Sequence, residues 1–326
     1  MNRTALVIGP AKYTHRGATF FSKEDVTITT EKETFEVNTS VHGKVDERAI
    51  EVVCKASVTP EGRVTQAILD VFYLPFANML LGTSAVGYTT SGLGVITAVN
   101  SNTDFPLVCS GADGEKHSLI AAYVSKPPDI ILSATKTMLG QAEFTGIRGN
   151  NKAWSDADGI YKHESGGEVA DATFDPANIF VRPYTGTWSG KTGFTAFETE
   201  DGFTVSINPT FKNITTDTNG TLNVVLEKIE VMAKCVPIGP TSAQLTSAFA
   251  IQGATVNRGH SLASFGAALT INDGATDVVS ISNAALKTGG FRFGATVLRA
   301  NEVGFVAART FAAGASQPLF TMELPT

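Results

Sequence analysis

The fold of this 326-residue chain is decided by residues 203–235, which read FTVSINPTFKNITTDTNGTLNVVLEKIEVMAKC. Phe203, Val205 and Ile207 alternate with polar residues, as expected for a β-strand with one buried face. Asn219-Gly220 follows, and this dipeptide is typical of a tight hairpin turn because both central residues there need positive φ. The segment therefore predicts two antiparallel strands joined by a turn.

In the second strand of this hairpin, the alternation of apolar and polar residues shifts by one position part-way along. One extra residue near Glu227-Lys228 accounts for the change, and an inserted residue of this kind is a β-bulge. The apolar positions on either side of it are Leu222, Val224 and Leu226, and then Ile229, Val231, Ala233 and Cys235.

The same alternation recurs outside this hairpin. Val26–Thr29 and Phe35–Val37 also predict strands with one buried face, and Asp273-Gly274 predicts a second tight hairpin turn. The chain is therefore expected to be mainly β, with largely antiparallel sheets. Further strands are expected at Ala49–Lys55, His117–Tyr123, Ile130–Ser133, Gln141–Gly146, Phe249–Val256, Phe291–Arg299, Gly304–Phe311 and Leu319–Glu323.

One α-helix is predicted at about residues 60–74. Thr59 can cap this helix, Pro60 suits its first turn, and Pro75 ends it. A second short helix is predicted to include Trp154–Tyr161. The first helix is recognised by an apolar stripe at i, i+3, i+4, i+7 and i+8, formed by Val64, Ala67, Ile68, Val71 and Phe72.

The composition excludes several classes of protein. With 43% apolar and 17% charged residues, the chain is neither disordered, collagen-like nor a coiled coil. Its 25 Lys and Arg against 31 Asp and Glu give a net charge of −6, which argues against gripping nucleic acid through its phosphates. The apolar run Ala5–Ile8 is too short for a signal peptide, so the protein is expected to be made in the cytosol.

No cofactor or metal is expected. Cys54, Cys109 and Cys235 lie far apart and form no CxxC pair, and the five histidines are scattered. The three thiols are predicted to be core or boundary residues in a reducing compartment. The segment Asp156–Gly159 has the look of a calcium loop but lacks the carboxylates that such a loop needs at its first and twelfth positions.

Two segments resemble enzyme motifs, and neither fits well. Gly186–Thr192 resembles a phosphate-binding loop, but three residues rather than four separate its glycines. Ser133 and Lys136 form an SxxK pair, as in penicillin-recognising serine enzymes, but Ser133 ends a strand-like run instead of opening a helix. We expect that the chain is not an enzyme, and a serine acylase built on these two residues is kept as an alternative.

Several other segments resemble the major tail tube proteins of long-tailed bacteriophages. The resemblance is carried first by His42–Arg48, Leu74–Asn78 and Leu81–Ser84. It continues through Ala112–His117, Lys126–Asp129, Leu139-Gly140 and Phe144–Ile147, and weaker echoes lie at Asp201–Phe203, Asn219–Thr221 and Pro318–Phe320. The resemblance covers roughly Ala5–Val236.

The resemblance implies a β-sandwich or barrel with one flanking helix. It also implies that six copies form a ring and that rings stack into a virion tail tube through which DNA passes without specific binding. The implied partners are further copies of the chain, a tape-measure protein, a tail terminator and baseplate or tip proteins. Assembly in the host cytoplasm, with no membrane insertion, is expected.

Within such a tube, two sets of residues are candidates for function. Thr27, Thr29, Glu31 and Glu33 lie opposite Val26 and Ile28 in phase and are expected to line the lumen, unless they form an ordinary solvated strand face. Contacts between rings are expected from two long polar segments, through Gly82, Gly92, Asn100, Trp154 and Asp156.

Residues 1–236 are expected to form the tube domain. Residues 237–326 either complete that domain or decorate the tube exterior, with Pro237–Pro240 as a hinge or loop between the two. A β-rich virion decoration or adhesion module is the alternative to the whole assignment, and the two functions differ in the size of the oligomer that they predict.

Overall fold

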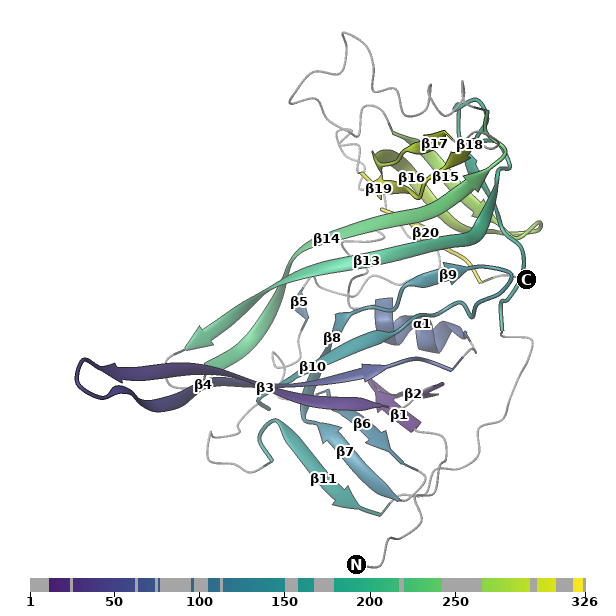
Figure 1. The fold of residues 1–326 in the computed structure, drawn as a ribbon. Coiled ribbons are helices and arrows are strands. Elements are labelled where there is room, and N and C mark those ends of the chain that lie inside the picture. The colour runs from purple at the N-terminus through teal and green to yellow at the C-terminus, as the bar shows by residue number, and fades with distance from the viewer. Residues whose placement is uncertain are drawn as a thin grey trace, which may run out of the picture.

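A computed structural model describes residues 12–23, 26–61, 64–73, 76, 95–96, 105–111, 114–149, 158–166, 179–216, 220–241, 266–293, 298–308 and 319–324. These residues form strands in antiparallel sheets and one α-helix (Figure 1). The predicted fold class, mainly β with antiparallel sheets and a single flanking helix, is confirmed for this part of the chain.

Two of the sheets pack face to face, and we call this pair the sandwich. A five-stranded sheet has the order β11-β7-β6-β1-β2, and a four-stranded sheet has the order β3-β4-β10-β8. The strands of the first are β11 (Tyr161–Ser165), β7 (Glu115–Leu119), β6 (Leu107–Ser110), β1 (Lys12–His15) and β2 (Ala18–Phe21). Those of the second are β3 (Thr27–Thr39), β4 (Gly43–Val58), β10 (Ala142–Ile147) and β8 (Ala121–Lys126).

The two sheets pack against each other through a shared apolar core. The rings of His15 on β1 and Phe144 on β10 are 5.1 Å apart, edge to face. A Cβ added to Gly146 on β10 would lie 3.0 Å from the Leu119 side chain on β7, so the glycine permits this close approach. Cys54 and Cys109 are buried free thiols of this core, and Cys235 is a third buried free thiol on β14, as predicted.

The helix α1 (Gln66–Tyr73) begins later than predicted. Thr59 and Pro60 are extended, and Pro60 forms a β-bridge with Ser22. Thr65 caps the helix instead, because its hydroxyl accepts a hydrogen bond from the amide of Ile68 at 3.4 Å. The apolar stripe was a correct signal for the helix, but the earlier Thr-Pro pair belongs to the strand edge that precedes it.

A third sheet contains nine strands, which are drawn from residues between 95 and 322. Its order is β12-β15-β16-β19-β14-β13-β9, with β20 paired to β16 and β5 paired to β14. Strands from residues 237–326 thus share a sheet with strands from residues 1–236. The bounds are β5 (Val95–Ile96), β9 (Ile130–Leu132), β12 (Thr185–Trp188), β13 (Glu198–Thr216), β14 (Gly220–Ile238), β15 (Ala267–Asn272), β16 (Asp277–Thr288), β19 (Val303–Ala307) and β20 (Thr321–Met322).

Trp188 lies in the core of this third sheet. Its indole Nε1 donates a hydrogen bond to the carbonyl oxygen of Ala284 at 3.0 Å, which satisfies the one polar atom of the ring. The ring meets Phe305 at 5.0 Å and Phe194 at 5.6 Å, both edge to face. The alternating apolar residues of β12, β16 and β19 therefore meet around one aromatic side chain.

The long hairpin of β13 and β14 has the predicted bulge. Thr210 pairs with Lys228 and Phe211 pairs with Leu226, so Glu227 is the extra residue. Gly220, the first residue of β14, has a φ of +62°. Residues 217–219 lie outside the described residues, so the turn type at Asn219-Gly220 stays a prediction.

The hairpin at Asp273-Gly274 exists, but its turn is not the predicted two-residue type. Asn272 pairs with Asp277, which leaves a four-residue loop in which Gly274 has a φ of +98°. The Asp273 carboxylate accepts hydrogen bonds from the amides of Ala275 and Thr276 at 3.0 and 2.7 Å and holds the loop. Burial disfavours the charged carboxylate, but these bonds and Arg182 outweigh it and keep the pKa of Asp273 low.

Three further predictions of secondary structure are wrong. The predicted strand His117–Tyr123 is divided at Ile120, because the chain passes there from β7 in one sheet to β8 in the other. The predicted strand Phe291–Arg299 is a two-stranded hairpin, β17 (Phe291–Phe293) and β18 (Leu298–Ala300). Tyr161 begins strand β11 and not a helix, and residues 151–157 lie outside the described residues.

The Pro237–Pro240 segment is only partly a loop. Pro237 and Ile238 still pair with β13, and the chain leaves β14 at Gly239, which has a φ of +101°. The predicted strand Phe249–Val256 lies outside the described residues.

Gly202 is expected to be critical for the junction between β9 and β13. Its φ is +85°, and a Cβ there would lie 2.2 Å from the carbonyl oxygen of Leu132. Gly202→Ala should therefore lower the free energy of unfolding by about 2–5 kcal/mol in urea denaturation. Gly190→Ala is the control, because its φ of +68° brings the same backbone strain with no atom within 4 Å, and it should cost only about 1–2 kcal/mol. Equal losses in the two variants would contradict the close approach.

His15 is expected to make stability depend on pH. The residue is 1% exposed, and burial together with the charge of Arg16 lowers its pKa from 6.5 to about 4. Between these values the unfolded chain binds a proton that the folded chain does not, so stability falls by about 3 kcal/mol as the pH drops from 6.5 to 4. His15→Phe should remove this component from urea titrations, whereas His42→Gln in the exposed β3–β4 turn should retain it. Identical pH profiles for His15→Phe and the wild type would refute the assignment.

Candidate assembly surface

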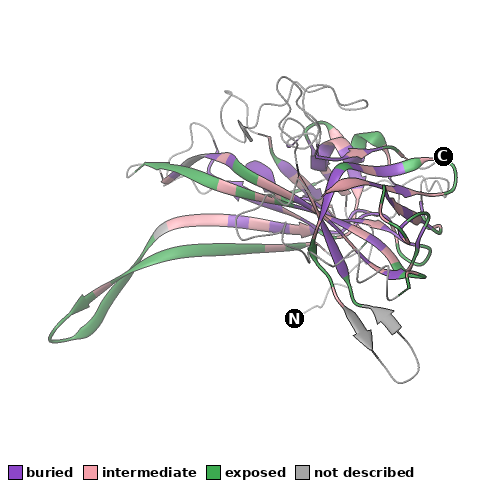
Figure 2. Ribbon diagram, turned by 90° about the horizontal axis from the view of Figure 1, so that it is seen from above, coloured by how far each residue is buried: buried purple, intermediate pink, exposed green. Residues whose placement is uncertain are grey.

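The β3–β4 hairpin extends from the sandwich toward the same side of the molecule as the β13–β14 hairpin (Figure 1). Its two strands pair from Thr27 and Ser57 to Thr39 and Gly43, with bulges where Ile50 and Val45 are extra residues of β4. Most of its outer part is exposed (Figure 2). Because bulges increase the local twist, the hairpin can diverge from the plane of its own sheet.

The four residues predicted to line a lumen share one exposed face of this hairpin. Thr27, Thr29, Glu31 and Glu33 are all exposed, whereas Val26 and Ile28 are partly buried against the core. We call the face that carries these four residues the polar face of the four-stranded sheet. The Lys55 ammonium lies 2.8 Å from the Glu31 carboxylate on that face.

The outer half of the hairpin has charged pairs in place of a core. Lys44 lies 2.6 Å from Glu47 and 2.9 Å from Glu36, and the Thr34 hydroxyl donates to Glu47 at 2.5 Å. The bonds to Glu47 and Glu36 raise the pKa of Lys44, and the bond from Lys44 lowers the pKa of Glu47. Such exposed pairs add little stability, so they mainly restrict the hairpin's geometry.

Apolar side chains near the hairpin tip are left exposed. Phe35 is 60% exposed, Val45 57% and Val41 80%. The prediction that Phe35 belongs to a buried strand face is therefore wrong for the isolated chain. By parity along β3, Phe35 lies on the same face as Glu31 and Glu33, at a point where the hairpin has left the body.

The outer edge of β3 has no second strand. Within the described residues β3 pairs only with β4, and at the opposite margin of the sheet β8 pairs only with β10. All residues of β3 except Ile28 and Val37 are exposed. Ala121–Val124 of β8 are buried, and the Ala122 amide donates to the carbonyl oxygen of Phe105 at 3.1 Å. The long edge of β3 is thus the accessible one of the two.

The β13–β14 hairpin covers part of the polar face. The Glu51 carboxylate accepts hydrogen bonds from the Thr221 amide and hydroxyl at 2.9 and 3.0 Å. The ring of Phe211 meets Tyr123 at 5.3 Å. Glu51 pairs with Glu33, and Tyr123 lies in the row of Thr29, so both contacts fall on the polar face. These contacts were not predicted, because nothing local in the sequence links residues so far apart.

The motifs that resembled enzyme sites have the following geometry. Ser133 is buried, its hydroxyl lies 3.2 Å from that of Thr135, and it accepts a hydrogen bond from the Thr135 amide. Lys136 is exposed in a bend and not one helical turn from Ser133. Gly190 and Lys191 of the loop-like motif form a turn after β12, with the Lys191 ammonium 5.2 Å from the centre of the Trp188 ring.

The residues predicted to join rings cannot be placed. Gly82, Gly92, Asn100, Trp154 and Asp156 all lie outside the described residues, so their role remains a prediction.

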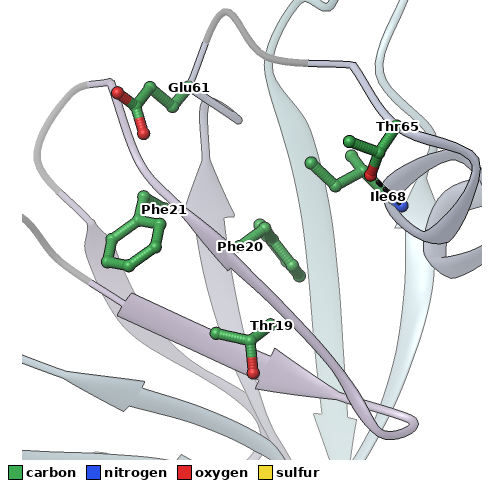
Figure 3. A pocket seen from close by; sticks show the side chains of 6 residues that line it. All are labelled: Thr19, Phe20, Phe21, Glu61, Thr65 and Ile68. Atoms are coloured by element: carbon green, nitrogen blue, oxygen red, sulfur yellow. Dashed lines mark hydrogen bonds between the residues drawn. The ribbon is translucent and has the colours of Figure 1, made fainter. Parts of the chain in front are cut away.

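A small pocket lies between β2 and the start of α1 (Figure 3). Its volume of about 140 Å³ is below the roughly 300–1,000 Å³ of most small-molecule sites. It is lined by Thr19, Phe20, Phe21, Glu61, Thr65 and Ile68.

No group of three or more His, Cys, Asp or Glu is arranged to hold a metal ion in the part of the chain that the structure describes. None of the helical residues described forms an apolar helix of membrane-spanning length.

No protein-family model matches the chain, and no curated protein sequence matches it significantly.

Proposed function

We propose that the chain is a structural virion protein that assembles into rings, and that the rings stack into a tail tube through which DNA is delivered. The observation that carries the proposal is the exposed edge of β3, which runs for 13 residues and pairs with no other strand than β4 among the described residues. An open edge of this length is a template for pairing with another chain, and a second copy with the same geometry is the simplest partner.

The strand directions favour a closed ring. The four strands of the β3-β4-β10-β8 sheet alternate in direction, so β8 runs opposite to β3. If β3 of one copy pairs with β8 of the next copy in a ring, that junction is again antiparallel, and the interface is head to tail. The Ala122 amide already donates to the carbonyl oxygen of Phe105, so this hydrogen bond must open before β8 can pair along its whole length.

A ring of this kind would enclose a wide channel. The resemblance to tail tube proteins implies six copies, and six four-stranded sheets would give 24 strands. With about 4.8 Å between strands and a tilt of about 40°, a 24-stranded barrel has a backbone radius of about 24 Å. Barrels of this size are hollow, whereas small barrels are filled by their own side chains.

The charge of the chain suits a conduit that does not hold DNA. Six copies with a net charge of −6 each give the ring a net charge of −36. We place Thr27, Thr29, Glu31 and Glu33 on the lumen wall. Lys55 neutralises Glu31 on this face, so Glu33 and the net negative charge of the ring repel phosphates and let DNA slide without specific binding. A tape-measure protein, a tail terminator and baseplate or tip proteins are the further partners of this proposal, and the virion tail, assembled in host cytoplasm, is its location.

A β-rich virion decoration or adhesion module is the alternative function. This alternative is supported by the exposed apolar side chains near the tip of the β3–β4 hairpin, which could contact a different protein. They are Phe35, Val41 and Val45. The two functions differ in self-assembly. Electron micrographs of the concentrated protein should show rings or tubes for the proposed function and isolated small particles for the alternative.

Two adjacent proline substitutions test the role of the β3 edge. Neighbouring residues of a strand direct their amides to opposite edges, so one of Thr29 and Thr30 faces β4 and the other faces outward. Because proline removes the amide donor, one of Thr29→Pro and Thr30→Pro should lower the melting temperature of the monomer. The other should leave it nearly unchanged and abolish tubes in electron micrographs. If both proline variants fold stably and both form normal tubes, the proposal is contradicted. Light scattering that shows a closed dimer would also contradict it.

Labelling in assembled tubes tests the lumen assignment. In Thr29→Cys the new thiol should react with a small maleimide in tubes but not with a polymer-linked maleimide too wide to enter. The same variant as a dissociated subunit is the matched control and should react with both reagents, and the native thiols are buried. Equal reaction of tubes with both reagents would place Thr29 on the tube exterior.

A further inference from the structure

The edge of the five-stranded sheet carries two histidines side by side. His117 on β7 and His163 on β11 are directly paired across the strands, and their ring centroids are 5.0 Å apart with 34° between the planes. The His163 side chain is 52% exposed, so solvent and small ions reach it. None of the functions discussed above uses this pair.

Each imidazole is held through one of its two nitrogens. The Nδ1 atom of His117 lies 2.6 Å from the Tyr161 hydroxyl, and the Nε2 atom of His163 lies 2.5 Å from the Glu115 carboxylate. An imidazole that donates one N–H to an outer oxygen keeps the lone pair of its other nitrogen available. That leaves Nε2 of His117 and Nδ1 of His163 as possible ligand atoms.

We propose that His117 and His163 together chelate a divalent transition-metal ion of the zinc, nickel or copper class. Imidazole nitrogen is a preferred ligand of these ions, whereas calcium and magnesium require oxygen ligands. Two nitrogens bound to one ion at about 2.0–2.1 Å lie about 3–3.5 Å apart, and rings with centroids 5.0 Å apart can place facing nitrogens in that range. Water completes the coordination, because two protein ligands alone leave open positions.

The surroundings of the pair fit an ion of this kind. The alternation of β7 and β11 puts Glu115 and Tyr161 on the same face as the two histidines, and Lys116 and Lys162 on the other. Lys162 is bound to Glu164 on that other face, at 2.7 Å. Cys109 pairs with His117 on the next strand, but burial raises the pKa of its thiol to about 12, so it stays protonated. Glu115 is therefore the only carboxylate bonded to either imidazole in the described residues.

Titration of the full chain with Zn²⁺ alone, by calorimetry, tests the proposal. One ion per chain is expected, and His117→Gln and His163→Gln should each weaken binding by at least tenfold. Glu115→Gln and Tyr161→Phe should weaken it by about 10- to 100-fold, because these residues position the ligands. His42→Gln is the matched control and should bind Zn²⁺ as the wild type does, since this histidine lies in the exposed β3–β4 turn.

NMR spectroscopy distinguishes Zn²⁺ binding at His117 and His163 from binding elsewhere on the chain. Nitrogen resonances of His117 and His163 should shift on Zn²⁺ addition while those of His42 stay in place. Thermal melts of the variants without metal show whether each is folded, and His163→Gln, at a half-exposed position, is expected to fold. Failure of the wild type to bind Zn²⁺, or binding that survives both histidine substitutions, would overturn the proposal. Because the test uses unassembled chain, its outcome is independent of ring formation.

Discussion

Among the described residues the outer edge of β3 pairs with no strand, and this open backbone edge is the constraint on which the proposed assembly depends. A sheet edge of 13 residues presents amides and carbonyls that must be paired by another chain or left to water. Here Thr, Glu and Lys side chains dominate the edge strand, so it stays hydrated in the single chain and does not collapse onto the core. The large apolar side chains that this hairpin leaves exposed lie toward its tip, at Phe35, Val41 and Val45. The hairpin therefore combines an open backbone edge with a small apolar group, which together suit association with a defined partner.

Within the nine-stranded sheet, the pairing of β9 with β13 requires Gly202, because any side chain there would strike the Leu132 carbonyl. The β13–β14 hairpin of this sheet lies on the polar face of the sandwich, through contacts of Glu51 with Thr221 and of Phe211 with Tyr123. Thr221 is buried, so removal of the Glu51 carboxylate would take away the acceptor of its amide and hydroxyl. These contacts join the β13–β14 hairpin to the sheet that carries the β3–β4 hairpin. They limit how far the two hairpins can move apart.

Much of this fold could be predicted from periodicity, and the errors have physical causes. The alternation of apolar and polar residues predicts β13 and β14, and a one-residue shift in that alternation predicts the bulge found at Glu227. The start of α1 was wrong because a Thr-Pro pair suits both a helix start and a strand edge, and only the bridge from Ser22 to Pro60 decides between them. The break at Ile120 was missed because Leu119, Ala121 and Ala122 are all buried, and a run of buried residues hides a passage between two layers. The polar face could be predicted from phase alone, but its cover by Phe211 could not.

The difference in length between β3 and β8 has a consequence for any ring built from these edges. Strand β3 has 13 residues and β8 has six, so a partner strand can take several registers along β3. Closure of a barrel requires its strands to be staggered, and a longer edge strand provides the residues for that stagger. Register is weakly specified where both faces of a strand are polar, as they are over Thr29–Glu33. The apolar tip residues can remove this ambiguity, because a shift by one residue would move the partner-strand side chains that lie beside Phe35 to the opposite face of the sheet. On this argument the polar part of the hairpin makes the long contact, and its apolar tip selects the register.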